Sequence, residues 1–174
     1  MNPSAIVDRL RQKLGDAVVG SNLEAVDPWV AVAPEALREA CLLLRDDPEL
    51  RFNFLNCISG VDYLQTDPKK KVDYQPHLEL LYHLWSLVHK HRLVLRVSLP
   101  RWKNDQPGEL PEVPTVSDIW RAADWHERET FDLVGVRFVN HPDPRRILCP
   151  DDWQGHPLRK DYVMPLEYGG IRGR

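Results

Sequence analysis

The feature that most constrains the fold is a pair of long apolar segments in the middle of the chain. They cover residues 77–88 and 93–99 and are separated by the polar run at 89–92. In the second segment every other residue is large and apolar: Leu93, Leu95, Val97 and Leu99. A period of two is typical of a strand with one face against a core. The two segments therefore predict a β-hairpin with residues 89–92 as its turn.

Helical signals come before this hairpin. Asn2-Pro3 is typical of an N-cap followed by proline at the first helical position, and Gly15 can end the helix that follows. Pro34 begins a second helix, and Asp46-Asp47-Pro48 ends it. The residues expected on its buried face are Leu37, Ala40, Cys41 and Leu44.

Three further strands and a third helix complete the expected elements. Strands are predicted near residues 29–33, 52–64 and 136–138, with Gly60 as a possible bulge in the second of them. The run from Thr115 to Asp118 fits a capping box and predicts a helix over residues 117–134 that Gly135 ends. Three charged residues four apart on that helix predict a ladder of ion pairs: Asp124, Arg128 and Asp132.

These elements predict an α+β fold, with a small mixed or antiparallel sheet and helices packed on it. Residues 1–150 are expected to form this domain, and residues 151–174 an extended C-terminal arm. The arm lacks any period but keeps large apolar residues: Trp153, Leu158, Tyr162, Val163, Met164, Leu166, Tyr168 and Ile171. Disordered tails are poor in such residues. We therefore expect the arm to bury them against the domain or against a second protein.

Composition and cysteine spacing argue against several classes of protein. The formal net charge is −3, so no global field favours nucleic acid or anionic lipid. Cys41, Cys57 and Cys149 lie far apart, which argues against a disulfide framework or a four-thiolate metal site and favours a reducing compartment. No apolar stretch is long enough to cross a bilayer, and residues 1–15 lack the apolar core of a signal peptide. Any membrane location is expected to come through partners.

The charged cluster on the predicted third helix also invites an enzymatic interpretation. A small hydrolase or metalloenzyme would use His126, Glu127 and Glu129. However, residues two apart on a helix point to opposite sides, so the two glutamates cannot form one acid–base pair. A third ligand beside His126 and Glu129 is not identifiable. We instead expect both acids to be partly buried, with Arg145 and Arg146, or arginines of another chain, as donors.

The helix and the segments after it form one long pattern with fixed gaps. The pattern consists of Glu127-Arg128-Glu129, Asp132-Leu133-Val134, His141, Arg145-Arg146-Ile147-Leu148, Pro150-Asp151-Asp152-Trp153 and Gly155-His156-Pro157-Leu158-Arg159-Lys160-Asp161-Tyr162. It resembles the signature of the thirty-kilodalton subunit of respiratory complex I, which is the C subunit of bacterial NADH–quinone oxidoreductase. The resemblance covers residues 52–168 and is strongest over 124–162. A match this long is more specific than a short catalytic motif.

The resemblance implies a non-catalytic structural subunit of the peripheral arm, with no active site of its own. No cofactor or metal would be bound by this chain, and FMN and iron–sulfur clusters would lie in partner subunits. The implied signature and interface residues are Glu127, Arg128, Glu129, Asp132, His141, Arg145, Arg146, Arg159, Lys160, Asp161 and Tyr162.

The resemblance also implies partners and a location. The chain would dock on the forty-nine-kilodalton-type subunit (the D subunit), which resembles a hydrogenase large subunit and is called the hydrogenase-like subunit below. The C-terminal arm would run along that neighbour, beside other peripheral-arm subunits. Association with the cytoplasmic face of the bacterial inner membrane would be peripheral.

The enzyme complex implied by the resemblance is a proton pump. The assembled enzyme would carry electrons from NADH through FMN and iron–sulfur centres to quinone and pump protons. An equivalent scaffold subunit of a membrane-bound hydrogenase, or of a ferredoxin-linked plastid or cyanobacterial complex, stays open as an alternative.

Overall fold

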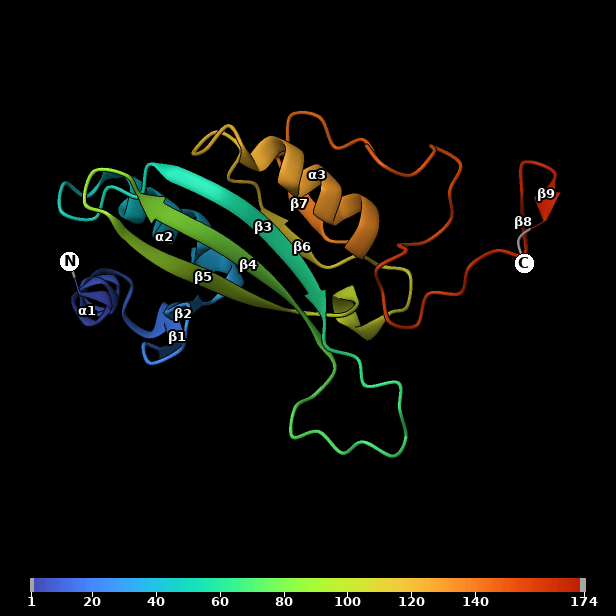
Figure 1. Cartoon of the computed structure of the whole chain (residues 1–174), viewed down its shortest axis with the longest axis horizontal. Coiled ribbons are helices and arrows are strands. Elements are labelled where there is room, and N and C mark those ends of the chain that lie inside the picture. Colours follow the sequence, from blue (N-terminus) through green and yellow to red (C-terminus); the bar gives the residue numbers. More distant parts are fainter. Residues whose placement is uncertain (1, 173–174) are drawn as a thin grey trace.

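A mixed five-stranded sheet forms the centre of the computed structural model, which describes residues 2–172. The strand order is β1-β2-β5-β4-β3 (Figure 1). The strands are β1 (Val18–Asn22), β2 (Trp29–Val32), β3 (Phe54–Asp62), β4 (His77–Ser86) and β5 (His91–Pro100). β2 runs parallel to β5, and the other neighbours are antiparallel. The α+β class with a mixed sheet is therefore confirmed, while β1 is not among the predicted strands.

The predicted hairpin is the most regular pairing in this sheet. β4 and β5 pair without interruption from His77 opposite Pro100 to Ser86 opposite His91. The turn covers residues 87–90, so the prediction that it extends to Arg92 is wrong. His91 belongs to the strand because it pairs with Ser86; its ring nitrogen Nε2 lies 2.8 Å from the Leu50 carbonyl oxygen, and its ring packs on Phe52.

Alternation along the hairpin gives the sheet one buried face. The residues buried on this face are Leu78, Leu80, Tyr82, Leu84, Ser86, Leu93, Leu95, Val97 and Leu99. Most of the intervening side chains are exposed or half-buried, although Val94 on β5 is also buried. The predicted core face of β5 is therefore confirmed.

The first helix forms as predicted, whereas the second begins as a 3₁₀ helix at Pro34 and becomes α-helical only at Leu37. α1 (Pro3–Leu14) begins after Asn2, whose side-chain oxygen accepts a hydrogen bond from the Ser4 N–H, and it ends at Gly15. The short 3₁₀ helices η1 (Gly15–Ala17) and η2 (Pro34–Ala36) precede β1 and α2 (Leu37–Asp46). The four residues expected on the buried face of α2 are all fully buried.

The third helix begins later than predicted. α3 covers Ala123–Val134, and residues 115–122 form turns and connecting backbone. The Thr115 hydroxyl accepts a hydrogen bond from the Ser117 N–H, and Asp118 pairs with Arg38 instead of completing a capping box. Such local bonds from a threonine side chain to the backbone compete with helix formation. Gly135, with φ of 77°, ends the helix as predicted.

Smaller elements complete the fold. The 3₁₀ helix η3 (Lys103–Asp105) lies in the loop after β5. β6 (Glu112–Pro114) and β7 (Arg137–Val139) pair in parallel beside α3. A short hairpin of β8 (Glu167–Tyr168) and β9 (Ile171–Arg172) lies at the far end of the arm, away from the sheet (Figure 1). These last strands are consistent with the expected arm.

Gly60 serves close packing and is not a bulge. The irregular pairing of β3 lies between Leu55 and Cys57. A Cβ atom at position 60 would lie 2.9 Å from Cγ2 of Thr130 and 3.0 Å from Cγ2 of Val134. The missing side chain therefore lets α3 pack directly on β3.

We expect Gly60→Ala to lower the free energy of unfolding by about 1–3 kcal/mol, because the added methyl group must displace α3. Equilibrium urea unfolding measures this change. The matched control is Gly20→Ala on β1, where the new Cβ would meet only ordinary contacts at 3.7 Å and 3.9 Å. Equal effects of the two substitutions would contradict this account of Gly60.

Candidate docking site

The root of the C-terminal arm is held on the domain by the buried guanidinium of Arg159. Its Nε donates to the Val134 carbonyl oxygen at 2.8 Å, and Nη2 donates to that of Gly135 at 3.1 Å. Nη1 donates to the Arg101 carbonyl oxygen at 2.8 Å, and the group lies 3.9 Å from the centroid of a ring of Trp102. One side chain thus joins the end of α3, the residues after β5 and the arm, using carbonyls that a helix end leaves unpaired.

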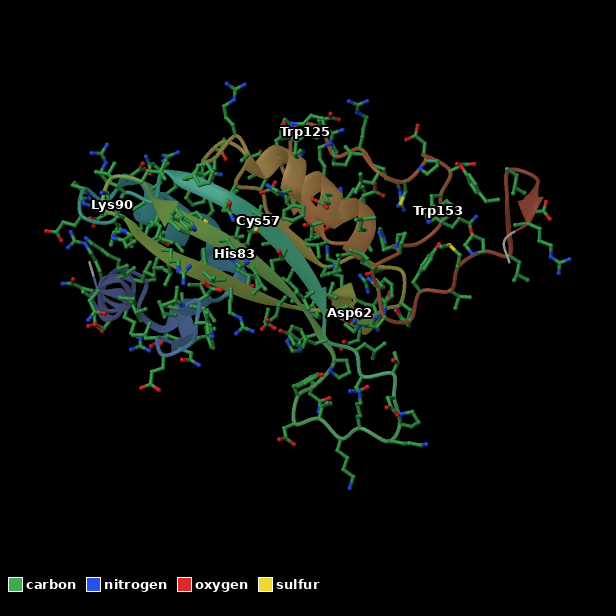
Figure 2. The ribbon with its side chains drawn as sticks, in the orientation of Figure 1. Cys57, Asp62, His83, Lys90, Trp125 and Trp153 are labelled. Carbon is green, nitrogen blue, oxygen red and sulfur yellow. The ribbon has the colours of Figure 1, made fainter. Side chains whose placement is uncertain are left out.

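Two carboxylates and Arg101 hold the arm beside this contact. Arg101 makes two hydrogen bonds of 2.9 Å to the buried Asp62 at the end of β3 (Figure 2) and one of 2.7 Å to Asp161 of the arm. The Lys160 N–H also donates to Asp62, at 2.9 Å. Neither Asp62 nor Arg101 is among the predicted site residues. The sequence could have indicated this pair. β3 and β5 are both antiparallel to β4, so they run in the same direction and their last residues lie at the same end of the sheet.

The Asp132 carboxylate ties α3 to the segment before the arm. Its Oδ2 accepts the N–H groups of Ile147, Leu148 and Cys149 at 3.0, 2.7 and 2.9 Å. Its Oδ1 accepts a hydrogen bond from Arg146 at 2.8 Å. Burial by itself would raise the pKa of this carboxyl, but these four donors outweigh burial and lower the pKa to about 2. Asp132 is therefore a charged link inside the protein.

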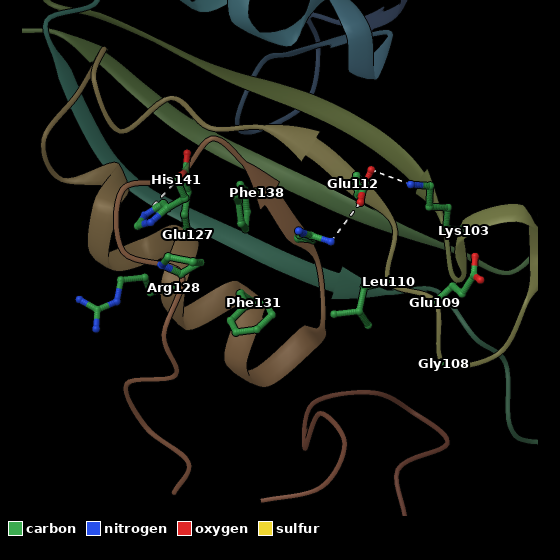
Figure 3. A pocket seen from close by; sticks show the side chains of 12 residues that line it. Lys103, Gly108, Glu109, Leu110, Glu112, Glu127, Arg128, Phe131, Phe138 and His141 are labelled. Atoms are coloured by element: carbon green, nitrogen blue, oxygen red, sulfur yellow. Dashed lines mark hydrogen bonds and ion pairs between the residues drawn. The ribbon is translucent and has the colours of Figure 1, made fainter. Parts of the chain in front are cut away.

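Glu127 is fully buried in a different environment on the same helix (Figure 3). Its carboxylate accepts hydrogen bonds from the Thr115 hydroxyl and, at 2.7 Å, from the Val116 N–H. His141 Nε2 lies 3.8 Å from Oε2. Burial is the largest cause that raises the pKa of Glu127, to about 7, and the two hydrogen bonds only partly oppose it. The neighbouring carboxyl of Asp124 raises this pKa further.

The predicted ladder of ion pairs along α3 is wrong. Arg128 lies 3.3 Å from Asp143 and over the ring of Trp125, while Asp132 binds Arg146. The loop after β7 folds back on the helix and offers closer partners than the next helical turn does.

The expected donors for the two glutamates are also wrong. Glu127 is bonded within the domain as described above, and Arg145 pairs with Asp143, not with either glutamate. Glu129 is exposed, with 49% of its side chain accessible, so the expectation of partial burial is wrong for it; its carboxylate lies 3.8 Å from Nδ1 of His126. The opposite environments of Glu127 and Glu129 agree with the helical geometry that argued against one acid–base pair.

A cavity of about 610 Å³ lies beside Glu127, between α3, β7 and the loop after β5 (Figure 3). Its walls include Leu110, Phe131 and Phe138. Two charged residues of its lining are paired with each other, since Glu112 accepts a hydrogen bond from Lys103 at 2.8 Å. Within residues 2–172 no group of three or more His, Cys, Asp and Glu side chains could hold a metal ion. In the same range no helix is long and apolar enough to span a membrane.

The outer part of the arm presents apolar side chains to solvent. Val163 is 84% exposed, Leu166 76% and Ile171 77%. Nearer the root, Trp153 (Figure 2) is half-buried. Its ring centroid lies 4.9 Å from that of Tyr168. The arm therefore has a fixed root and an exposed apolar outer part.

The structure divides the predicted signature residues into three groups. Those that are buried are Glu127, Arg128, Asp132, His141 and Arg159. Arg146 and Tyr162 are half-buried, and those at the surface are Glu129, Arg145, Lys160 and Asp161. Many of their contacts join α3, the following loop and the arm to one another. Their role at an interface stays a prediction.

The chain is similar in sequence to proteins of one family. A family profile described as "Respiratory-chain NADH dehydrogenase, 30 Kd subunit" matches residues 30–168. The C subunit of the NADH-quinone oxidoreductase of Roseiflexus sp. (strain RS-1) is 41% identical over 96% of this chain and 87% of the relative. The protein of the same name from Chlorobium phaeobacteroides is 38% identical over 97% and 93%.

A solved structure shares the fold. A chain in the membrane-bound sulfane sulfur reductase, an archaeal respiratory membrane complex, superposes with a TM-score of 0.69. The match covers 94% of this chain and 87% of that chain, at 23% sequence identity.

We expect Asp132→Asn to lower the free energy of unfolding at pH 7 by about 2 kcal/mol. A carboxyl whose folded-state pKa is depressed stabilises the protein above its ordinary pKa of 3.8, and this contribution is lost as pH falls to about 2. Urea unfolding at pH 7 and near pH 2 should show the deficit disappearing. A deficit of the same size at both pH values would contradict the assignment, and the surface variant Asp8→Asn is the control.

We expect Glu127→Gln to raise the free energy of unfolding, in contrast to Asp132→Asn. A buried carboxyl with a raised pKa costs stability when it is charged, so the variant should be about 1–3 kcal/mol more stable than the wild type at pH 8. Near pH 4.5 the wild-type group is protonated in the folded state and the gain should vanish. Urea unfolding at both pH values measures this, with the exposed Glu129→Gln as control. A loss of stability at pH 8 would show that the charged form is the favoured one.

Proposed function

The chain belongs to the "Respiratory-chain NADH dehydrogenase, 30 Kd subunit" family, whose bacterial members are C subunits of NADH-quinone oxidoreductase, and we propose that it works there as a non-catalytic docking subunit. As a member it is part of a membrane-associated enzyme complex, and its partners are other subunits of that complex. The proposal concerns what this chain contributes: binding surface, while other subunits carry the redox chemistry.

The observation that carries the proposal is the division of the arm into a fixed root and an exposed apolar end. Val163, Leu166 and Ile171 place three large apolar side chains of one short segment in water, which is typical of a protein–protein interaction site. Their burial against another subunit would offset the entropy that the outer arm loses on docking. Arg159 reduces that loss, because it holds the root in place before docking.

The signature carboxylates support a structural role. Asp132 uses its two oxygens to accept four donors within the chain, and Glu127 is enclosed between Thr115, Val116 and His141. Both side chains are inaccessible to solvent, which favours a structural role. We propose that FMN and iron–sulfur clusters lie in partner subunits and that this chain binds none.

The proposed partner of the arm is the hydrogenase-like subunit, the D subunit of the complex, which contributes to the quinone site. In this arrangement the chain sits in the peripheral arm on the cytoplasmic face of the inner membrane. The complex passes electrons from NADH through FMN and iron–sulfur centres to quinone and pumps protons. The chain is 41% and 42% identical to two proteins named as C subunits of NADH-quinone oxidoreductase, which favours this enzyme complex.

An equivalent scaffold role in a hydrogenase or a ferredoxin-linked complex is the second candidate. The observation in its favour is the fold shared with a chain of an archaeal sulfane sulfur reductase. That likeness shows that this fold occurs in more than one respiratory complex. Co-purification from native membranes with NADH- and FMN-binding subunits would decide for the first candidate.

We expect the double variant Val163→Asp/Leu166→Asp to weaken binding to the purified hydrogenase-like subunit by more than about tenfold. Each apolar side chain contributes on the order of 1.5–3 kcal/mol when buried, and a carboxylate in its place would be desolvated. Titration of the full-length chain with the partner measures the affinity. The stability of the free chain should not change, because both side chains are exposed.

The matched control places the same charges on the distant turn between β4 and β5. Leu87→Asp/Val88→Asp also replaces two exposed apolar residues, with 59% and 49% exposure, and should leave the affinity unchanged. Equal loss in both variants, or no loss in either, would be evidence against the arm as the docking element. NADH oxidation or quinone reduction by the isolated chain would refute the non-catalytic role.

A further inference from the structure

β3 is a long strand at an open edge of the sheet. In the part of the chain that the structure describes, it pairs with β4 on one side and with no strand on the other. It covers nine residues, and after the irregularity between Leu55 and Cys57 its pairing is regular to Asp62. Every second residue of such an edge directs its N–H and C=O groups away from the sheet. These groups can be paired by one further strand.

The sequence of β3 lacks most of the features that natural proteins use to protect an edge. Those features are short length, lysine, proline and bulges along the strand. β3 has no lysine, arginine or proline, and its single charge, Asp62, is buried against Arg101. The opposite edge is shorter, because β1 has five residues, although each of the two edge strands has one irregularity in its pairing. Of the two edges, that of β3 is the one suited to receive a strand.

A groove follows this edge. It has a volume of about 330 Å³, and four consecutive strand residues, from Cys57 to Gly60, form one wall. The exposed side of α3 forms the other wall through His126, Glu129 and Leu133. Figure 2 shows Cys57 on β3 beneath α3. The side chains of an added strand that point toward α3 would enter this groove, as alternate residues do when an extended segment joins a sheet.

The groove is continuous with the arm. Leu158, which is 57% exposed and immediately precedes Arg159, lines the groove together with β3 and α3. Its N–H donates to the Leu133 carbonyl oxygen at 2.9 Å, so its position is fixed by α3. A subunit that covers the root of the arm at Leu158 would therefore lie next to the β3 edge.

We propose that β3 receives an extended strand of the same partner subunit that binds the arm, so that the five-stranded sheet becomes six-stranded across the interface. This inference rests on the proposed docking function and adds a second contact of a different kind. The arm supplies apolar side chains, whereas β3 supplies main-chain hydrogen bonds. The occupant must be an extended backbone, because a helix has already used its own N–H and C=O groups.

Residue-resolved hydrogen exchange tests the proposal directly. The full-length chain is labelled alone and bound to the hydrogenase-like subunit, then quenched and dissociated before measurement. Added strand pairing should slow exchange at least tenfold at alternate amides of residues 57–61, the ones that point outward. The amides of β1, at the other edge, should not change. Uniform slow exchange of β3 in both samples, or slowing without alternation, would overturn the proposal.

A pair of lysine variants provides a second test. Ser59→Lys places on β3 the kind of residue that protects natural edges, and it should weaken partner binding about tenfold or more. Ser98→Lys makes the same exchange at an exposed position of β5, which is paired with β4, and should bind as the wild type does. Comparable affinities of the two variants would overturn the proposal.

The outcomes distinguish this inference from the proposed function. If the wild-type chain binds the hydrogenase-like subunit through its arm but β3 exchange does not change, the inference fails and the proposed function stands. If the chain binds a different subunit and alternate amides of β3 become protected, the strand edge stands and the assigned partner fails. Concentration-dependent dimers with protected β3 and no protection in the complex would show that a second copy is the occupant, which also overturns the proposal.

Discussion

The arrangement of the whole C-terminal third depends on the buried guanidinium of Arg159. The last carbonyl groups of α3 have no partner within the helix, and the residues after β5 leave another carbonyl free. Arg159 binds all three, so the helix, the sheet and the arm meet at one side chain. The guanidinium is suited to this because its donors form a rigid planar fork, and a lysine could not reach the same three oxygens in this geometry.

Two carboxylates on one helix show how differently burial can act. Asp132 and Glu127 are both inaccessible to solvent, but Asp132 meets four donors, one of them charged, while Glu127 meets two neutral donors and lies near other acids. The first carboxylate stabilises the fold in its charged form, and the second is tolerated best when protonated. Both place a signature residue inside the protein, where it organises the loops around α3.

In the proposed function, the domain would offer its partners two unlike surfaces. One is the apolar outer arm, held at a fixed root. The other is the edge of β3, which is unpaired within residues 2–172; Leu158, next to the root, lines the groove between this edge and α3. A combination of apolar burial and main-chain pairing gives both affinity and a defined orientation. Such a surface suits a subunit whose contribution to an enzyme complex is to position its neighbours.

Local regularity in the sequence determined much of this protein. Several features can be recognised within short stretches of sequence, because strand and helix geometry repeat over a few residues. They are the period of two in β5, the apolar face of α2, the proline and glycine residues at the helix ends, and the family pattern from Glu127 to Tyr162. These features were sufficient to predict the α+β class, the hairpin and an arm with apolar residues. They also separated Glu127 from Glu129, since helical rotation alone decides that.

Only the tertiary structure decided which groups meet. Asp132 finds its donors 14 to 17 residues later, Glu127 is bonded by Thr115 from before the helix, and Asp62 meets Lys160 across 98 residues. The late start of α3 depends on Thr115 and Asp118 having partners other than the helix, and the need for Gly60 depends on how closely α3 approaches. Pairings of this kind are set by the packing of segments that are distant in the sequence. They cannot be predicted from the pattern of neighbouring residues.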